Sequence, residues 1–101
     1  MKKFYAGVVL NKDELTNSDS NHIELEYYKI LRTNKGSFTK KSNLYGIEIV
    51  KKEYLGKRKT KEKNNIYDLT NDETIVDKLL DILKTNKVTP IMLNDVVDEI
   101  L

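Results

Sequence analysis

The clearest hydrophobic pattern in this chain lies in its last third, where apolar residues return every three or four positions. Between Thr70 and Asn86 this period gathers six side chains on one face: Ile75, Val76, Leu79, Leu80, Ile82 and Leu83. Such a stripe predicts an amphipathic helix. Thr70 stands in capping-box relation to Glu73, and Asn86 is a residue type that closes helices in the left-handed conformation. We therefore predict a helix that begins after Thr70 and ends at Asn86.

A second helix is predicted to follow Thr89-Pro90. Threonine is a good N-cap, and proline fits the first helical position, where no amide donor is needed. The buried stripe of this helix is predicted to be Leu93, Val96, Val97 and Ile100. We expect Val96 and Ile100 of this helix to be buried together with Leu79 and Leu83 of the first helix and with Ile47. Two short helices cannot bury both stripes against each other alone, so they need a sheet or a partner, and the first 69 residues are expected to supply a sheet.

Before Thr70 the apolar residues follow the two-residue period of strands. We predict strands at 2–10, 22–33 and 44–55 and a short one at 64–69, with polar loops at 11–21, 34–43 and 56–65. The first strand is expected to be mostly buried, because residues 5 and 9 are apolar as well as 4, 6, 8 and 10, with Gly7 at a bulge or a close contact. In the second strand the alternation slips at Tyr27-Tyr28, which either a bulge or a strand that is apolar on both faces would explain.

These elements together predict the fold class. Four strands joined by hairpin-length loops, then two helices, indicate an α+β protein with an antiparallel sheet of about four strands, meander-like, and both C-terminal helices packed on one face. The chain of 101 residues has no internal repeat or linker and is expected to form one domain, 1–101. Glutamates 24, 26 and 48 are expected on the open face, with Lys29, Lys51 or Lys52 as cross-strand partners.

The net charge of +2 conceals a basic amino-terminal part and an acidic carboxyl-terminal part. Residues 1–69 carry 15 Lys and Arg against 9 Asp and Glu, whereas residues 70–101 carry 3 against 7. The basic residues are densest in the region 51–63, where a loop with Tyr54 beside it would be able to follow a phosphate backbone. Because Glu53 and Glu62 interrupt this run of basic residues, we favour a solvated loop that binds no partner. Nucleic acid and an acidic protein are the alternative partners of this loop.

Several functions are excluded or disfavoured by composition. The chain has no cysteine and one histidine, His22, so disulfides, thiol catalysis and Cys/His zinc sites are excluded. No glycine loop for phosphate is present, and no partner for His22 is evident, so we predict no catalytic, cofactor-binding or metal-binding residue, no small-molecule ligand and no enzymatic activity. The acidic second helix argues against a helix-turn-helix reader of DNA. The apolar run near the start is too short for a signal peptide or membrane span, so a cytoplasmic location is expected.

Three segments resemble a known group of proteins: 45–49 (YGIEI), 68–72 (DLTND) and 88–96 (VTPIMLNDV), with a further likeness at 27–31 (YYKIL). In order and spacing they resemble a family of short uncharacterised proteins from clostridia and related Firmicutes, known as a domain of unknown function. The resemblance covers about 23–101. It implies a bacterial cytoplasmic protein and adds no functional residue. Met92 stands where family members often have histidine, which weakens any idea of a catalytic histidine there.

The tyrosines provide the leading functional hypothesis. All six fall in predicted strands, and those on the face away from the helices would form an amphipathic surface of the kind used in protein contacts. We therefore predict a protein-interaction or regulatory module, homodimeric through the open sheet face or bound to another protein. The alternative is a nucleic-acid-associated protein that uses the basic loop 51–63. The candidate partner-binding residues are Tyr28, Tyr54, Lys57, Arg58, Lys59 and Lys61.

Overall fold

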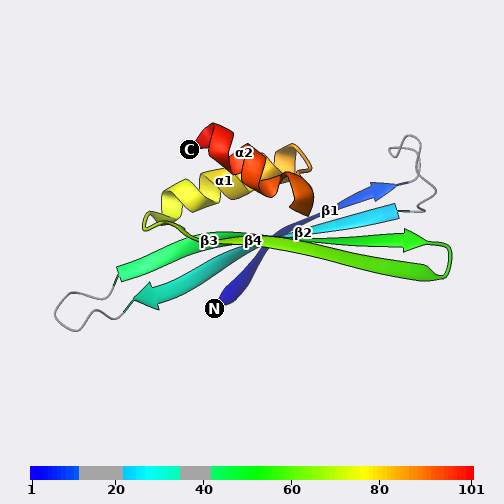
Figure 1. Cartoon of the computed structure of the whole chain (residues 1–101), viewed down its shortest axis with the longest axis horizontal. Coiled ribbons are helices and arrows are strands. Elements are labelled where there is room, and N and C mark those ends of the chain that lie inside the picture. The colour runs from blue at the N-terminus through cyan, green and yellow to red at the C-terminus, as the bar shows by residue number, and fades with distance from the viewer. Residues whose placement is uncertain (12–21, 35–41) are drawn as a thin grey trace.

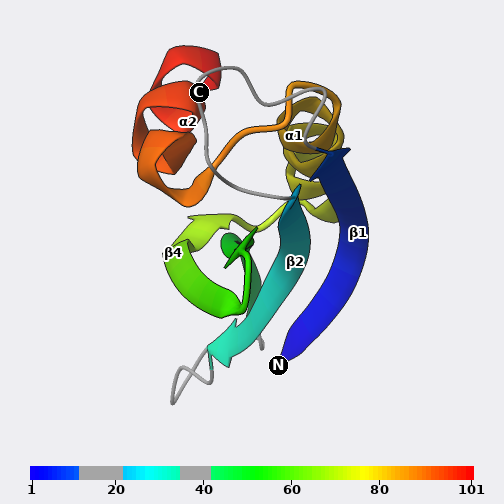
Figure 2. The ribbon, with the colours of Figure 1, turned by 90° about the vertical axis from the view of Figure 1, so that its right-hand side faces the viewer.

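Four antiparallel strands follow one another across a single sheet in the same order as in the sequence. The computed structural model describes residues 1–11, 22–34 and 42–101. Its strands are β1 (Lys2–Asn11), β2 (His22–Asn34), β3 (Ser42–Leu55) and β4 (Arg58–Thr70). The predicted loops 11–21 and 34–43 lie outside the described residues, except for their ends, which belong to strands. Figure 1 shows the long sheet, and Figure 2 shows its strong twist.

Two helices and one short 3₁₀ helix cover one face of this sheet (Figures 1 and 2). They are α1 (Glu73–Thr85), η2 (Pro90–Met92) and α2 (Leu93–Ile100). Helix α1 contacts all four strands, whereas η2 and α2 lie over β3 and β4. The predicted α+β class, the four-stranded meander and the two C-terminal helices on one face are therefore confirmed.

The core lies between the helices and the sheet face that they cover. Its buried members are Ile23, Leu25, Tyr27, Tyr45, Ile47, Ile49, Val76, Leu79, Leu80, Leu83, Val88, Leu93 and Val97. Tyr27 is fully buried, and its hydroxyl donates a hydrogen bond of 2.9 Å to the carbonyl oxygen of Val88 in the α1–α2 connection. Because a buried hydroxyl without a partner is costly, this bond fixes where the connection lies on the sheet.

The apparent slip at Tyr27-Tyr28 is resolved by a strand that is apolar on both faces. The register of β2 with β3 is continuous, so β2 has no bulge on that side. The irregularity is in β1, where Phe4 pairs with Tyr28 and Ala6 with Tyr27, which leaves Tyr5 as the extra residue. The bulge is thus not at Gly7. The expectation that the first strand is mostly buried is wrong, because β1 is an edge strand and Val9 is 54% exposed.

The predicted loop 56–65 is wrong. Only Gly56 and Lys57 form the turn, and β4 begins at Arg58, directly opposite Leu55. Gly56 has a φ of +59°, which a two-residue hairpin with glycine at its first central position requires. The lysine-bearing residues 58–63 form a strand because each of them pairs with a residue of β3. Their charged side chains remain exposed to water on both faces of the sheet. The predicted short strand at 64–69 is the second half of β4.

A wide bulge interrupts the far end of β4. Tyr45 pairs with Thr70 and Ile47 pairs with Ile66, so one residue of β3, Gly46, lies opposite three residues of β4. Asp68, within this bulge, has a φ of +56°, a left-handed conformation that aspartate tolerates better than most residues. The backbone of β4 passes close to Gly46 at this point, and a side chain there would meet it.

The capping box predicted at Thr70 is wrong. The N-cap of α1 is Asp72, whose Oδ1 accepts a hydrogen bond of 2.9 Å from the amide of Thr74. Thr70 is still paired with Tyr45 in the sheet, so its backbone is not available to start a helix. Its hydroxyl instead accepts a bond of 3.0 Å from the amide of Asp72 and steadies the strand-to-helix junction.

The carboxyl end of α1 also differs from the prediction. Asn86 is the C-cap, with a φ of −93°, and the left-handed residue is Lys87, with a φ of +52°. The amides of Lys87 and Val88 donate to the carbonyl oxygens of Lys84 and Leu83, which is the Schellman arrangement. Val88 and Leu83 are both buried, so the apolar contact that accompanies this motif closes the helix over the core.

The predicted stripe of the second helix is correct in part. Leu93 and Val97 are buried and Val96 packs against the core, but Ile100 is 41% exposed. The chain forms the 3₁₀ helix η2 after Thr89, and α2 begins only at Leu93. All four predicted positions lie within α2 and share one face, but Ile100 is the last residue of the helix and lines a surface hollow with Ile75 and Ile82. Of the expected core set, Leu79, Leu83 and Ile47 are buried.

Polar contacts join α1 to the edge of the sheet. Lys29 lies on the helix-covered face, not on the open face as expected, and its Nζ is 3.0 Å from Glu73 Oε2 and 2.7 Å from Asp77 Oδ1. The β1 bulge directs Tyr5 to the same helix, where its hydroxyl donates a bond of 2.6 Å to Asp81 Oδ1. Burial lowers the pKa of Lys29, but the hydrogen bonds to Asp77 and Glu73 outweigh it, so the pKa is raised.

The raised pKa values of two tyrosines in this helix-covered layer predict that the protein loses stability at alkaline pH. The hydrogen bond to Asp81 raises the pKa of Tyr5 to about 12, and burial raises the pKa of Tyr27 to about 12. Each pKa is higher in the folded state than in the unfolded state, where it is about 10. The stability that the two protonated tyrosines contribute is therefore complete below a pH of about 10 and is lost as the pH rises through about 12. Urea unfolding from pH 8 to 11.5 should therefore show a falling midpoint. Tyr5→Phe and Tyr27→Phe should each flatten the fall, and an unchanged fall in both variants would contradict this prediction.

Candidate functional site

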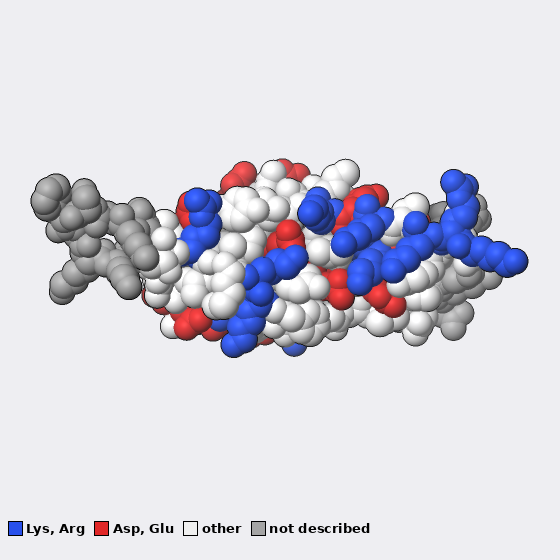
Figure 3. Space-filling model, turned by 90° about the horizontal axis from the view of Figure 1, so that it is seen from below, with Lys and Arg blue, Asp and Glu red and all other residues white. Residues whose placement is uncertain are grey.

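The open face of the sheet, opposite the helices, gathers most of the residues that the sequence nominated for binding. Strand alternation directs Tyr28 and its partner Glu48 to this face, while their neighbours Tyr27 and Ile49 enter the core. Figure 3 views the molecule from this side. The predicted split between Tyr27 in the core and Tyr28 on the open face is thus confirmed.

Aromatic and apolar side chains form one part of the open face, which we call the aromatic patch: Phe4, Tyr28, Ile30 and Tyr67. The rings of Phe4 and Tyr28 meet edge to face, with centroids 5.6 Å apart. Phe4 and Tyr67 are 55% and 50% exposed, whereas Ile30 is nearly buried. Gly46 lies between Ile30 and Tyr67 in the sheet and adds no side chain. The patch therefore has a filled centre and two protruding rings.

Two cations lie over rings of the aromatic patch. Lys2 Nζ is 4.6 Å from the ring centre of Tyr28, and the guanidinium of Arg32 is 5.4 Å from that of Tyr67. Lys2 also forms an ion pair of 2.7 Å with Glu48, which is only 5% exposed, and this hydrogen bond raises the pKa of Lys2. The buried carboxylate of Glu48 is thus neutralised by Lys2.

Lysines form the other part of the open face, which we call the lysine row: Lys59, Lys61 and Lys63. They alternate along β4 with residues of the opposite face, and all three are exposed. Other cations of this face are paired: Lys52 with Glu26 at 3.2 Å and Arg32 with Asp68 at 3.5 Å. In the described part of the chain no ion pair joins the lysine row to a carboxylate. In Figure 3 the blue side chains accordingly extend toward the β3–β4 turn.

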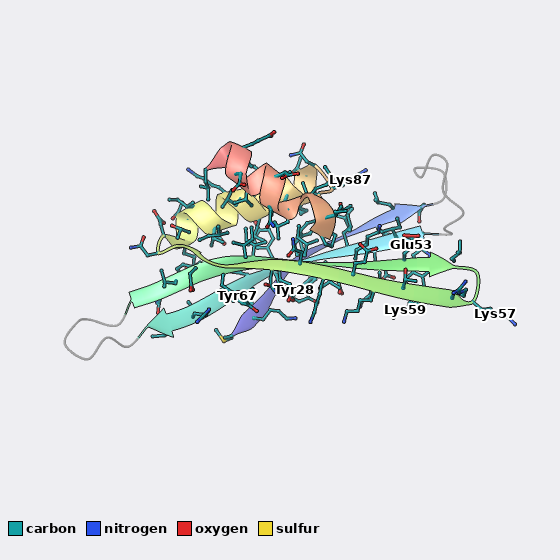
Figure 4. All side chains as sticks on the ribbon, in the orientation of Figure 1. Tyr28, Glu53, Lys57, Lys59, Tyr67 and Lys87 are labelled. Atoms are coloured by element: carbon teal, nitrogen blue, oxygen red, sulfur yellow. The ribbon has the colours of Figure 1, made fainter. Side chains whose placement is uncertain are left out.

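The six nominated residues do not form a single site. Tyr54 lies beside the lysine row, where it stacks on His22 at 4.2 Å and has Lys59 Nζ 5.4 Å from its ring centre. Lys57 is in the turn, and Arg58 is on the opposite face from Lys59 and Lys61. Figure 4 shows Tyr28 well separated from Lys57 and Lys59. The structure thus unites Tyr54, Lys59 and Lys61 and separates Tyr28 from them.

Two exposed aromatics of this face, Phe4 and Tyr67, were not among the nominated residues. Phe4 was expected to be buried with most of the first strand, but the bulge at Tyr5 reverses the phase and turns Phe4 outward. Tyr67 lies in the bulge of β4, which no residue type in the sequence announces. The adjacent aromatics Phe4-Tyr5 were the one available signal, since both cannot occupy the same face of a regular strand.

The described residues form small surface hollows, and their acidic and histidine side chains do not cluster as metal ligands would. Among residues 1–11, 22–34 and 42–101, no group of three or more His, Asp or Glu side chains is placed to hold a metal ion. A hollow of about 180 Å³ lies beside Arg32, Thr33, Leu44 and Asp68, and it is open to solvent. In the same ranges, no helix has the length and apolar character needed to cross a membrane.

The fold and this face define a class: a four-stranded meander domain with two helices on one side and an aromatic and basic open face on the other. Residues 6–101 match a family described as "Family of unknown function (DUF6514)", and the chain belongs to that family. The likeness to a domain of unknown function is thus confirmed. Neither the curated proteins nor the solved structures contain a match to this chain.

Proposed function

We propose that this protein is a non-enzymatic, cytoplasmic binding module that engages another protein through the aromatic patch. One observation carries the proposal: Phe4 and Tyr67 expose half or more of their side chains on a face that the helices leave uncovered. Rigid aromatic side chains lose little entropy on binding and are enriched at the energetic centres of protein interfaces.

The surroundings of the aromatic patch define the chemistry of the partner. Lys2 and Arg32 stand at the patch and already lie near Glu48 and Asp68. An apolar side chain of the partner would rest between the two rings, and polar groups at its rim would meet the two ion pairs. The partner surface is therefore apolar at its centre and polar at its edge. Such complementarity gives specificity and a faster association rate more than affinity.

The lysine row supports a second candidate function, nucleic-acid binding. Three lysines without a carboxylate partner in the described residues, beside Tyr54, resemble the electrostatic part of a single-strand groove. Two features speak against it. A cation already lies over the ring of each open-face tyrosine, 28, 54 and 67, where a base would stack. Glu24 and Glu26 also lie on this face.

The two candidates are separated by two variants. The patch variant combines Phe4→Ala with Tyr67→Ala, and the row variant changes Lys59, Lys61 and Lys63 to Gln. A partner is first captured by the parent protein from nuclease-treated lysate of the producing cells, then purified and titrated by calorimetry. We expect the patch variant to weaken its Kd by about 30-fold, the effect of ~2 kcal/mol for an interface anchor, while the row variant changes it little.

Oligonucleotide titrations provide the opposing measurement. If the lysine row binds nucleic acid, the parent should bind labelled single strands with an affinity that falls with salt. The row variant should lower the slope of that dependence by about 0.7 for each phosphate that it no longer neutralises. Binding of oligonucleotides by the parent, abolished in the row variant and retained in the patch variant, would overturn the protein-binding proposal. Circular dichroism spectra that match the parent's are required of both variants.

A further inference from the structure

The two edges of the sheet differ in how they are protected. Edge strands attract other strands unless charges, bulges or covering elements prevent it. Strand β4 has such protection: it carries the lysine row and the wide bulge, and Asn64 donates a bond of 3.0 Å to the carbonyl of Pro90 in η2. Strand β1 has charges only at Lys2 and Lys3, and from Phe4 to Leu10 it carries none. Strand β1 also has a bulge, at Tyr5, but its residues 6–10 carry neither a charge nor a bulge, so this stretch is the less protected edge (Figure 2).

The hydrogen-bonding positions of β1 follow from its first pair. Met1 exchanges both backbone bonds with Leu31, at 2.7 Å and 2.8 Å. Antiparallel strands alternate bonded and non-bonded pairs, so Phe4, opposite Tyr28, turns its N–H and C=O outward. The bulge at Tyr5 shifts the alternation by one residue. Beyond it, Gly7 and Val9 face outward, while Val8 bonds to β2.

We propose that two copies of this chain pair through β1 in antiparallel fashion, with Val8 on the two-fold axis. Gly7 of each copy exchanges its backbone bonds with the partner's Val9, and Val9 with the partner's Gly7. The two four-stranded sheets then form one continuous sheet. This inference does not depend on the proposed function, and it would set two aromatic patches on one extended face.

The sequence of β1 favours a second copy as the occupant of this edge. In this register Gly7, which has no side chain, lies beside the partner's Val9 on the open face, where that valine is more than half exposed in the single chain. Antiparallel pairing also puts Lys2 and Lys3 at opposite ends of the paired strands, so like charges do not face each other. The acidic residues that α1 presents near this edge are bonded to Lys29 and Tyr5. Few residues meet, so the dimer is expected to be reversible.

A single cysteine tests the register, because the chain has none of its own. In the proposed register, Val8 of one copy lies directly opposite Val8 of the other in a non-hydrogen-bonded pair. The Cα atoms of such a pair are about 4.5 Å apart, within the range that a disulfide spans. With oxidised glutathione as electron acceptor, two thiols of Val8→Cys should join as one disulfide-linked dimer. Val9→Cys is the matched control. Val9 lies opposite Gly7 of the partner copy, two residues away from the partner's Val9, so this variant should give little disulfide-linked dimer. Equal cross-linking of both, or none with Val8→Cys, would overturn the register.

Sedimentation equilibrium tests the pairing without any cross-link. The parent protein should show a monomer–dimer equilibrium in the micromolar range, in the absence of any other protein. Val9→Pro removes an outward amide that β2 does not use, so the fold should persist while the dimer weakens at least tenfold. Val9→Thr keeps the amide and should dimerise as the parent does. A parent that stays monomeric at millimolar concentration would overturn the proposal but would not affect the protein-binding function.

Discussion

Replacing Leu79 with Ala is expected to lower the free energy of unfolding by ~2–5 kcal/mol. Leu79 is 2% exposed on the inner side of α1, where it lies in the core formed with Ile47 and Leu93. The truncation removes apolar contacts and leaves a cavity that the rigid sheet beneath cannot fill. Urea unfolding followed by circular dichroism measures the loss directly.

Ile82 provides the control for this prediction. It lies on the same helix but is 37% exposed, at the surface hollow that it lines with Ile75 and Leu101. Ile82→Ala should cost about 1 kcal/mol or less, because most of the area removed already faces water. Similar losses in the two variants would show that the inner side of α1 is assigned wrongly.

Gly46→Ala is expected to cost ~1–3 kcal/mol, the range for forcing atoms into a filled site. A Cβ at this position would press on the carbonyl oxygen of Ile66 and lie 3.0 Å from the Cα of Tyr67. Both obstacles are backbone atoms of the β4 bulge, so relief requires that β3 and β4 move apart. The unfolding midpoint at one low protein concentration measures the effect.

Gly7→Ala is the matched control in the same sheet. An added Cβ there would meet Phe4 Cζ at 3.5 Å and Leu25 O at 3.7 Å, which are ordinary contacts. Its effect should fall between zero and a gain of about 0.5–1 kcal/mol, since alanine restricts the unfolded chain more than glycine does. A loss at Gly7 as large as that at Gly46 would contradict the role given to the bulge.

The sequence predicted the strongly periodic parts of this fold and missed the parts that depend on a neighbouring strand. The stripe of α1 and the alternation Ile23-Leu25-Tyr27 are determined by burial, so they are visible as patterns. Residues 58–63 have no apolar period and read as a loop, yet they pair with β3 along their whole length. Thr70 was predicted as the N-cap from its spacing to Glu73 alone, whereas the pairing of Thr70 with Tyr45, which the sequence does not show, leaves Asp72 as the cap.

The sequence predicted the candidate site only in part, as it did the fold. Tyr28 was placed on the open face because Tyr27 continues the core face. The lysines 57–61 were grouped by their nearness in sequence, but a strand sends Lys59 and Arg58 to opposite sides. Phe4 was expected to be buried and is exposed, and Lys29 was assigned to the wrong face. For Phe4 the cause is the bulge. For Lys29 it is strand alternation, which puts Lys29 on the same face as Tyr27 and opposite Ile47, where the carboxylates of α1 lie within reach.

The meander has a consequence for how quickly the chain reaches this structure. Each strand pairs only with the next one along the sequence, so all three pairings close between neighbours and lose little loop entropy. A sheet of this kind has low contact order and is expected to form faster than a Greek key of similar length. The distant contacts come with the helices, as between Tyr27 and Val88, 61 positions apart. The sheet can therefore assemble first, and the docking of α1 and α2 then becomes the slower step of folding.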